Sequence, residues 1–406
     1  MKLKKTLSAL AIATGVLGSA GRAMAQSPCS NATYFPNPVY MAGSSAFEPT
    51  LARIALKLAA QTPPVTIIYK TSASCDGPNA IISNGPLTGN AHYFVPNPAI
   101  SADNPLPYVI NSCILDPDQP KALIGVADVA FQTCIGTPPP ATIGEYTGPI
   151  QAMLFVVPAA NQTTTAISAE QAADIYGCGL TSGVSPYTDE TAIQQRNPTS
   201  GTQRMISAYI GVKPEAWKGK QNAGSADVVN SLLAGSDPMK AIGILAADFY
   251  ATPPNSTNLH ALAFRGFGQT KAYYADSAPG ALDKKNVRDG HYMIQGPLHF
   301  FTTLTNGQPS SKAKQILDFL QGNTRIDPSN ANAYIDAVTA AGAVPNCAMK
   351  VTRDVDGGYL CSYTPPVSCG CYFEATASST SPIGCKPCTT SADCTGGTTC
   401  QTGYCE

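Results

Sequence analysis

The chain carries Arg-Asn-Pro-Thr-Ser-Gly-Thr at positions 196–202, directly ahead of an apolar stretch, Met205–Ile210, that predicts a helix. This order of residues is suited to holding an oxyanion. Ser200 and Thr202 supply hydroxyl groups, Gly201 lets the backbone approach a ligand closely, and the following helix directs free N–H groups at it.

The first residue of this motif, Arg196, adds a planar and permanently charged fork that matches the geometry of a phosphate group. An alternative interpretation is that Ser-Gly-Thr only forms a turn and caps the helix, as these residue types often do. Three further segments of the chain favour the oxyanion interpretation.

The first 25 residues have the pattern of a secretion signal. Three lysines within the first five residues precede an apolar stretch over 7–20, and residues 23–25, Ala-Met-Ala, form a small-x-small cleavage site. The apolar stretch is short for a membrane span, and no later segment has the length and apolarity of one. Cys29 would be the fourth mature residue, after a proline, so we expect no lipid-modified N-terminus. These features predict a soluble protein in the periplasm, outside the cell or on the cell surface.

Length and charge limit the classes of partner. At 406 residues the chain is long enough for two domains and a small extra module. The predicted signal removes four of the 25 basic residues and none of the 26 acidic ones, so the mature net charge is −5. No basic stripe is visible, and we expect no nucleic acid as partner. A small anion remains compatible, because local dipoles and one arginine can hold it in a closed pocket.

Fourteen cysteines in an exported chain predict disulfide bonds. Five lie before residue 200 and nine from Cys347 onward, and this odd split predicts that Cys347 pairs with the main body. The eight from Cys361 to Cys405 would then staple a small tail module, with their pairing left open. Zinc is the alternative for the closely spaced pairs at 369–371 and 385–388. The tail has no histidine and exported compartments are oxidising, which favours disulfides.

Strand-like and helix-like patterns alternate through most of the chain, which is typical of an α/β fold with parallel sheets. Residues 38–70 have the pattern of strand, turn, helix and strand. Ile150–Val157 is almost continuously apolar, as expected for a parallel strand covered on both faces. Ser168–Tyr176 is predicted to be a helix that begins with a capping box. Residues 83–120, rich in Pro, Asn and Gly, are predicted to be a long surface excursion pinned by Cys113.

Four loops lie where a ligand could bind. Gly43-Ser44-Ser45 and Ser72-Ala73-Ser74 each follow a predicted strand, Asp128 lies near the end of a third, and residues 196–202 open a helix. In open α/β sheets, ligands bind beyond the carboxyl ends of the strands, so these positions are suitable. Each loop alone is also compatible with ordinary strand-to-helix turn chemistry.

Taken together, these segments resemble the periplasmic phosphate-binding proteins that deliver phosphate to ABC transporters. The resemblance spans Pro38–Val344 and is most specific in the Arg-x-x-x-Ser-Gly-Thr motif. Weaker matches lie at 42–49, 69–77, 124–128, 241–244 and 290–294.

The resemblance implies an α/β, two-domain type-II periplasmic binding protein fold with a small disulfide-rich C-terminal module. The corresponding divisions are a signal peptide at 1–25, domain I at 26–149 and 275–345, domain II at 150–274, and a cysteine-rich tail at 346–406.

The resemblance also implies a phosphate site between the domains, made of Ser45, Ala46, Ser74, Asp128, Arg196, Ser200, Gly201 and Thr202. Asp128 is the informative member of this set. A carboxylate beside an anion is unfavourable unless it accepts a hydrogen bond from that anion, and phosphate keeps a proton at neutral pH whereas sulfate does not. The alternative is that Asp128 only caps a helix or ends a strand.

The chain departs from the family pattern in three places. Pro198 stands where the family has an aspartate paired with the arginine, and Ala127 stands where serine is common. The interval from Ser74 to Asp128 is longer than usual. These departures keep another tetrahedral oxyanion open as the ligand.

We expect no catalysis, no metal and no cofactor. None of the four histidines lies near a serine or cysteine in a hydrolase pattern, and none has metal-site spacing. No Walker loop or dinucleotide fingerprint is present. We expect a monomer that closes around its ligand by hinge motion, with an ABC permease as a possible partner. The cysteine-rich tail supports a second hypothesis, in which the same fold is reused for interaction at the cell surface.

Overall fold

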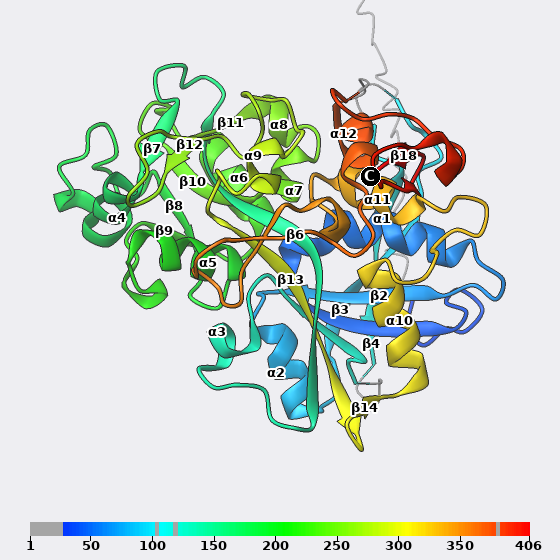
Figure 1. Cartoon of the computed structure of the whole chain (residues 1–406). Helices are drawn as coiled ribbons and strands as arrows, with labels where there is room; N and C mark the ends of the chain where they lie inside the picture. Colours follow the sequence, from blue (N-terminus) through cyan, green and yellow to red (C-terminus); the bar gives the residue numbers. More distant parts are fainter. Residues whose placement is uncertain (1–26, 102–104, 117–120, 379–381) are drawn as a thin grey trace, which may run out of the picture.

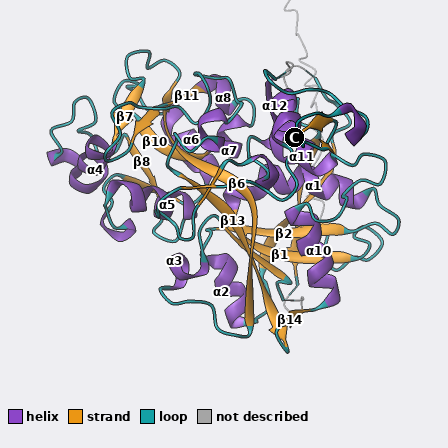
Figure 2. Ribbon diagram, viewed as in Figure 1, coloured by secondary structure: helices purple, strands orange, loops and turns teal. Residues whose placement is uncertain are grey.

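The computed structural model describes residues 27–101, 105–116, 121–378 and 382–406, so the predicted signal peptide lies outside the described residues. Within these ranges, no helix is both long enough and apolar enough to cross a bilayer. Figures 1 and 2 show two lobes of strands and helices that two long strands join, with the C-terminal tail packed beside one of them.

Most strands of the two lobes belong to one 12-stranded mixed sheet. Its main path runs through β4 (Tyr108–Leu115), β3 (Gly89–Pro96), β2 (Thr66–Ser72), β1 (Pro38–Ser44), β5 (Ile124–Ala127), β13 (Gln295–Thr305), β6 (Ile143–Pro158), β10 (Ile242–Ala246), β8 (Ile193–Arg196) and β9 (Lys220–Asn222). Off this path, β11 (Leu259–Ala261) pairs with β6 and β14 (Gln308–Pro309) pairs with β13. A separate pair joins β7 (Ala166–Ser168) to β12 (Ala263–Arg265).

Helices divide between the two lobes. We use lobe I for β1–β5 together with α1 (Glu48–Ala59), α2 (Asp76–Ser83), α3 (Phe131–Ile135), α10 (Ser311–Gln321) and α11 (Ala333–Ala341). We use lobe II for β7–β12 together with α4 (Ala169–Cys178), α5 (Gly201–Ile210), α6 (Ser225–Leu233), α7 (Ala247–Ala251), α8 (Asn255–Asn258) and α9 (Lys285–Arg288). The residue boundaries of the two predicted domains stay a prediction.

Within the 12-stranded sheet, the parallel strands form two groups, one in each lobe. The group β2-β1-β5 lies in lobe I and the group β10-β8-β9 lies in lobe II. Between them, β13 and β6 run antiparallel to each other and to their other neighbours. The prediction that Ile150–Val157 is a parallel strand is therefore wrong in direction, although its burial is as predicted. A continuous apolar run indicates burial on both faces and carries no information on strand direction.

The predicted capping box at the start of α4 is confirmed. The Gln171 backbone N–H donates to Ser168 Oγ at 3.2 Å, and the Ser168 backbone N–H donates to Gln171 Oε1 at 3.0 Å. These reciprocal bonds satisfy two N–H groups that the first turn of a helix would otherwise leave free.

The prediction that residues 83–120 form a long surface excursion is wrong for the part that forms strands. β3 and β4 pair as an antiparallel hairpin from Gly89↔Leu115 to Pro96↔Tyr108, and β3 joins the sheet beside β2. Burial along both strands alternates only imperfectly, so the sequence gives a weak period-two signal there. The prediction that Cys113 pins this region is confirmed by its disulfide with Cys29.

The tail contains β15 (Val351–Thr352), β16 (Cys361–Ser362), α12 (Gly370–Ser378), β17 (Cys400–Gln401) and β18 (Tyr404–Cys405). Disulfides Cys371–Cys385, Cys388–Cys400 and Cys394–Cys405 staple it, as the predicted mini-module requires. Among the described residues, the one group of candidate metal ligands is Cys388, Cys394 and Cys405, and disulfides engage all three sulfur atoms.

The predicted link from Cys347 to the main body is wrong, because Cys347 pairs with Cys369 inside the tail region. The odd numbers of cysteines before residue 200 and from Cys347 onward have another origin. Cys178 in lobe II and Cys361 in the tail are exposed free thiols, so each part of the chain holds one unpaired cysteine.

Candidate functional site

Three neighbouring parallel strands direct polar side chains to one point at their carboxyl ends. Asp128 directly follows β5 and is 1% exposed. Its Oδ2 accepts a hydrogen bond from Ser44 Oγ at 2.7 Å and another from Ser74 Oγ at 2.7 Å. Ser44 ends β1 and Ser74 lies two residues beyond β2, so adjacent strands place all three groups together.

The predicted oxyanion motif of lobe II meets this point directly. The backbone N–H of Gly201, the first residue of α5, donates to Ser74 Oγ at 2.9 Å. The backbone N–H of Cys75 donates to the Thr199 carbonyl at 3.1 Å, so the contact runs in both directions between the lobes. Only glycine fits at position 201, since a Cβ there would lie 2.4 Å from Ser74 Oγ and 2.8 Å from Asp128 Oδ2.

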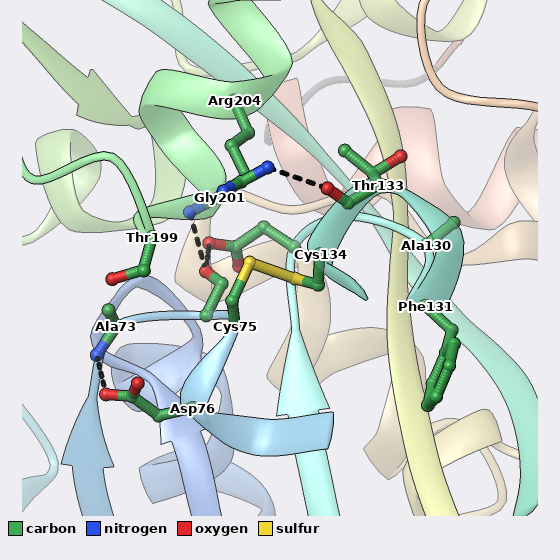
Figure 3. The surroundings of a disulfide bond; sticks show 12 residues. Ala73, Cys75, Asp76, Ala130, Phe131, Thr133, Cys134, Thr199, Gly201 and Arg204 are labelled. Atoms are coloured by element: carbon green, nitrogen blue, oxygen red, sulfur yellow. Dashed lines mark hydrogen bonds between the residues drawn. A yellow bond between two sulfur atoms is a disulfide. The ribbon is translucent and has the colours of Figure 1, made fainter. Parts of the chain in front are cut away.

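A disulfide reinforces the lobe I side of this contact. Cys75, next to Ser74, is bonded to Cys134 in α3. Figure 3 shows Arg204 reaching from α5 toward α3, and its Nη1 donates to the Thr133 carbonyl at 2.8 Å. The loop after β2, helix α3 and the start of α5 therefore form one connected structure around Asp128.

Arg196 supplies the buried positive charge. It ends β8 and is 2% exposed. Its Nη1 donates to Ser225 Oγ at 3.0 Å, and its Nη2 donates to the Ala223 carbonyl at 3.0 Å and more weakly to Ser45 Oγ at 3.5 Å. A hydroxyl and a carbonyl thus orient the guanidinium, whereas Pro198 offers no carboxylate to do so.

Opposing electrostatic effects act on the two buried charges. Burial raises the pKa of Asp128, while the hydroxyls of Ser44 and Ser74 and the positive charge of Arg196 act to lower it. Burial lowers the pKa of Arg196 to about 10, opposed by the Asp128 carboxylate, so the guanidinium keeps its charge at neutral pH.

Several polar atoms at the site have no hydrogen-bond partner within the described part of the chain. They are Asp128 Oδ1, Thr202 Oγ1 and Arg196 Nε, and all three are buried. A buried carboxylate oxygen and a buried hydroxyl are costly when unpaired, so this arrangement favours a guest that both donates and accepts hydrogen bonds.

Similarity to solved structures gives the fold. A phosphate ABC transporter substrate-binding protein from Clostridium perfringens, with bound phosphate, matches with a TM-score of 0.50 and 15% identity over 76% of this chain and 99% of that chain. An ABC-type phosphate transport receptor from Vibrio cholerae has a TM-score of 0.46 and 14% identity over 75% and 99%. The reduced OxyR regulatory domain from Pseudomonas aeruginosa has a TM-score of 0.38 and 8% identity over 70% and 96%.

The chain has the type-II periplasmic binding protein fold. No protein-family model and no curated protein matches the sequence. An identity of 15% establishes the fold alone. The six disulfides of this binding-protein fold accord with an extracellular location.

The predicted site residues lie together, with one shift in position. Besides Ser74, the serine that donates to Asp128 is Ser44, one residue before the predicted site residue Ser45. Ser45 lies instead beside Arg196, and the backbone N–H of Ala46 donates to Ser44 Oγ at 3.1 Å. Ser200 is buried at the N-terminus of α5. Ligand contact by these residues stays a prediction.

Sequence reasoning missed a second buried carboxylate near the site. Asp248 lies two residues after the end of β10 and is fully buried. Its carboxylate accepts hydrogen bonds from Gln151 Nε2 at 2.7 Å and from the Phe249 backbone N–H at 2.7 Å. Burial raises its pKa well above the usual aspartate value, and the negative charge of Asp128 raises it further. An acidic residue just after a strand was the available signal, as it was for Asp128.

We expect Asp248→Asn to flatten the pH dependence of stability. A raised pKa means that the folded protein holds a proton where the unfolded chain has released it. Unfolding free energy therefore falls as pH rises from the ordinary aspartate range toward the raised value. Asparagine does not titrate, and the Gln151 amide can turn its unpaired Oε1 toward the new N–H₂ group.

Urea unfolding of the ligand-free protein between pH 4 and pH 8 measures this effect. The variant should match the parent at the acidic end and exceed its stability at the basic end. Asp128, which the variant retains, also makes the unfolding free energy fall as pH rises, so the pH dependence should be flattened only in part. Equal slopes for parent and variant would show that Asp248 does not carry the effect, and Asp354→Asn at an exposed position is the matched control.

Proposed function

We propose that the protein is an exported solute-binding protein that binds inorganic phosphate between its two lobes. The supporting observation is the meeting of Asp128, Ser44 and Ser74 from lobe I with Gly201 and Arg196 from lobe II. Binding energy for a small tetrahedral anion would come from the buried guanidinium, the hydroxyls and the N-terminus of α5.

The unpaired oxygen of Asp128 favours a protonated oxyanion. Oδ2 already accepts two hydroxyl donors, so Oδ1 is the atom left to accept a proton from the ligand. Phosphate carries such a proton at neutral pH, and sulfate does not. Sulfate would place an oxygen lone pair against the carboxylate in a buried setting, where repulsion is strong.

Calorimetry of the full mature protein with phosphate and with sulfate tests the proposal. We expect phosphate to bind and sulfate to bind about a hundredfold more weakly or not at all, because the mismatch leaves a buried charged group unpaired. Absence of heat with both anions, or equal affinity for both, contradicts the proposal.

Changing Asp128 to asparagine should reverse the preference between the two anions. The amide oxygen can still accept from Ser44 and Ser74, while the amide N–H₂ takes the place of Oδ1 and donates to the ligand. That donor suits fully deprotonated sulfate and removes the acceptor for the proton of phosphate. We expect phosphate affinity to fall about tenfold or more and sulfate affinity to rise. Unchanged selectivity in Asp128→Asn would exclude Asp128 from ligand recognition, and Asp189→Asn on the surface of lobe II is the control.

The proposal is one of binding without catalysis, and delivery to an ABC permease is part of it. The alternative of a surface-interaction role for the tail needs a test other than removal of the tail. Truncation at Pro345 would remove Asp356, whose carboxylate contacts α3 beside the proposed site. Loss of phosphate binding after truncation would therefore not separate the two roles.

A further inference from the structure

One segment of the cysteine-rich tail lies across both lobes. Residues 350–362, called the strap below, contain β15, β16 and the loop between them. In Figure 1 this orange segment leaves the region of α11, passes across β6 and β13, and reaches α5. Two side chains of the loop, Arg353 and Asp356, bind opposite lobes of the protein.

Asp356 attaches the strap to lobe I. Its Oδ2 accepts hydrogen bonds from the Ala130 backbone N–H at 2.8 Å and from Thr133 Oγ1 at 2.5 Å. Ala130 directly precedes α3, so Asp356 satisfies one backbone N–H at the start of this helix, while Glu145 accepts the N–H of Phe131. Ala130 lies two residues after Asp128. A disulfide between Cys134 of α3 and Cys75 also links this helix to the loop that holds Ser74.

Arg353 attaches the strap to lobe II. Its guanidinium lies over the ring of Tyr209 in α5, 5.3 Å from the ring centre, and its Nη2 donates to the Met293 carbonyl at 3.0 Å just ahead of β13. Gly357 lies against Ala208 of the same helix, where a Cβ would come within 2.9 Å of the alanine methyl group. A stacked and partly buried guanidinium is held more firmly than an exposed charge.

Contacts with the end of α9 and a disulfide within the tail hold the base of the strap. The Lys350 backbone N–H donates to the Arg288 carbonyl at 3.2 Å, and Lys350 Nζ lies 3.1 Å from Asp289 Oδ1. The disulfide Cys347–Cys369 closes the loop from which the strap extends. The loop of the strap therefore reaches from α3, beside Asp128, to α5, which begins at Gly201.

We propose that the strap is a tether that holds the two lobes closed and slows ligand exchange. Lobe separation moves α3 away from α5, and this movement requires release of either Asp356 or Arg353. The exchange part of the proposal rests on the proposed function, whereas the tether itself does not. A receptor of this kind would retain its anion longer than one whose lobes open freely on their hinge.

The tether needs both Asp356 and Arg353, so loss of either contact should release the lobes. This dependence gives the sharpest test. Hydrogen exchange of segment 129–135 is measured in the full ligand-free mature protein for the parent, Asp356→Ala, Arg353→Ala and the double variant. Arg353 does not contact this segment, yet Arg353→Ala should speed its exchange about tenfold, because the strap then leaves α3 more often. The double variant should exchange no faster than Asp356→Ala alone. Asp354→Ala, an exposed neighbour in the same loop, should match the parent.

Phosphate release, followed with labelled phosphate, provides the second measurement, and both single variants should release it about tenfold faster than the parent. Unchanged exchange of 129–135 in Arg353→Ala would overturn the tether. If the parent binds no phosphate, the proposed function fails while the exchange measurement still decides the tether. Asp356→Leu, which has a similar size and cannot accept a hydrogen bond from Ala130 or Thr133, replaces the alanine variant if that variant does not fold.

Discussion

Replacing Arg196 with alanine is expected to abolish measurable phosphate binding. Arg196 supplies the buried positive charge at the contact between the lobes, and Asp128 lies close enough for the two charges to act on each other. Removing one partner from a buried set of opposite charges costs about 3–5 kcal/mol. That energy corresponds to a loss of about a hundredfold or more in affinity. The pKa of Asp128 should also rise further, since one of the effects that lowers it is gone.

Calorimetry with phosphate measures this loss, and thermal unfolding of the ligand-free variant shows whether it still folds. Arg196→Lys keeps the charge but cannot reach Ser225, Ala223 and Ser45 with one planar fork, so intermediate affinity is expected. Arg265→Ala removes an exposed arginine that pairs with Glu170 at 3.3 Å, and it should bind phosphate like the parent. Retention of parental affinity by Arg196→Ala would remove the electrostatic basis of the proposed function.

The sequence was sufficient to predict that these residues lie together, because strand order and loop chemistry agree there. Asp128, Ser74 and Gly201 each follow or begin an element whose pattern is clear, and parallel strands bring their carboxyl ends to one edge. The exact hydroxyl was less predictable. Ser44 is the last residue of β1, whereas Ser45 begins a 3-10 turn, and this change of backbone conformation directs Ser44 toward Asp128 and Ser45 toward Arg196.

Long-range contacts account for most of what the sequence did not reveal. Asp356 accepts the backbone N–H at the start of α3 across an interval of 226 residues, and no local sequence pattern predicts such a partner. Cys347 could pair forward or backward in the chain, because composition fixes the number of cysteines and not their geometry. The hairpin of β3 and β4 escaped notice since tertiary pairing at the sheet edge, more than local propensity, makes those residues strands.

Changing Gly201 to alanine is expected to keep the fold and to lose phosphate affinity. Gly201 is the first residue of α5, where alanine is the better helix former by about 0.5–1 kcal/mol. Helix propensity alone would make the variant slightly more stable. The contact between the lobes predicts the opposite for binding, because the new Cβ would lie 2.4 Å from Ser74 Oγ and 2.7 Å from Asp128 Cβ.

The two effects separate because they act on different states of the protein. Overpacking by one methyl group costs about 1–3 kcal/mol, and this cost applies only when the lobes are closed. The ligand-free protein can relieve this cost by a small separation of the lobes, so thermal stability should change less than phosphate affinity, which should fall about tenfold to a hundredfold. Small-angle scattering should show a larger radius for Gly201→Ala with phosphate than for the parent. Gly235→Ala, at an exposed position whose nearest neighbour to a new Cβ is 3.6 Å away, is the matched control. Parental affinity in Gly201→Ala would mean that the ligand is held without the close approach of α5 to Asp128, and the site between the lobes would have to be abandoned.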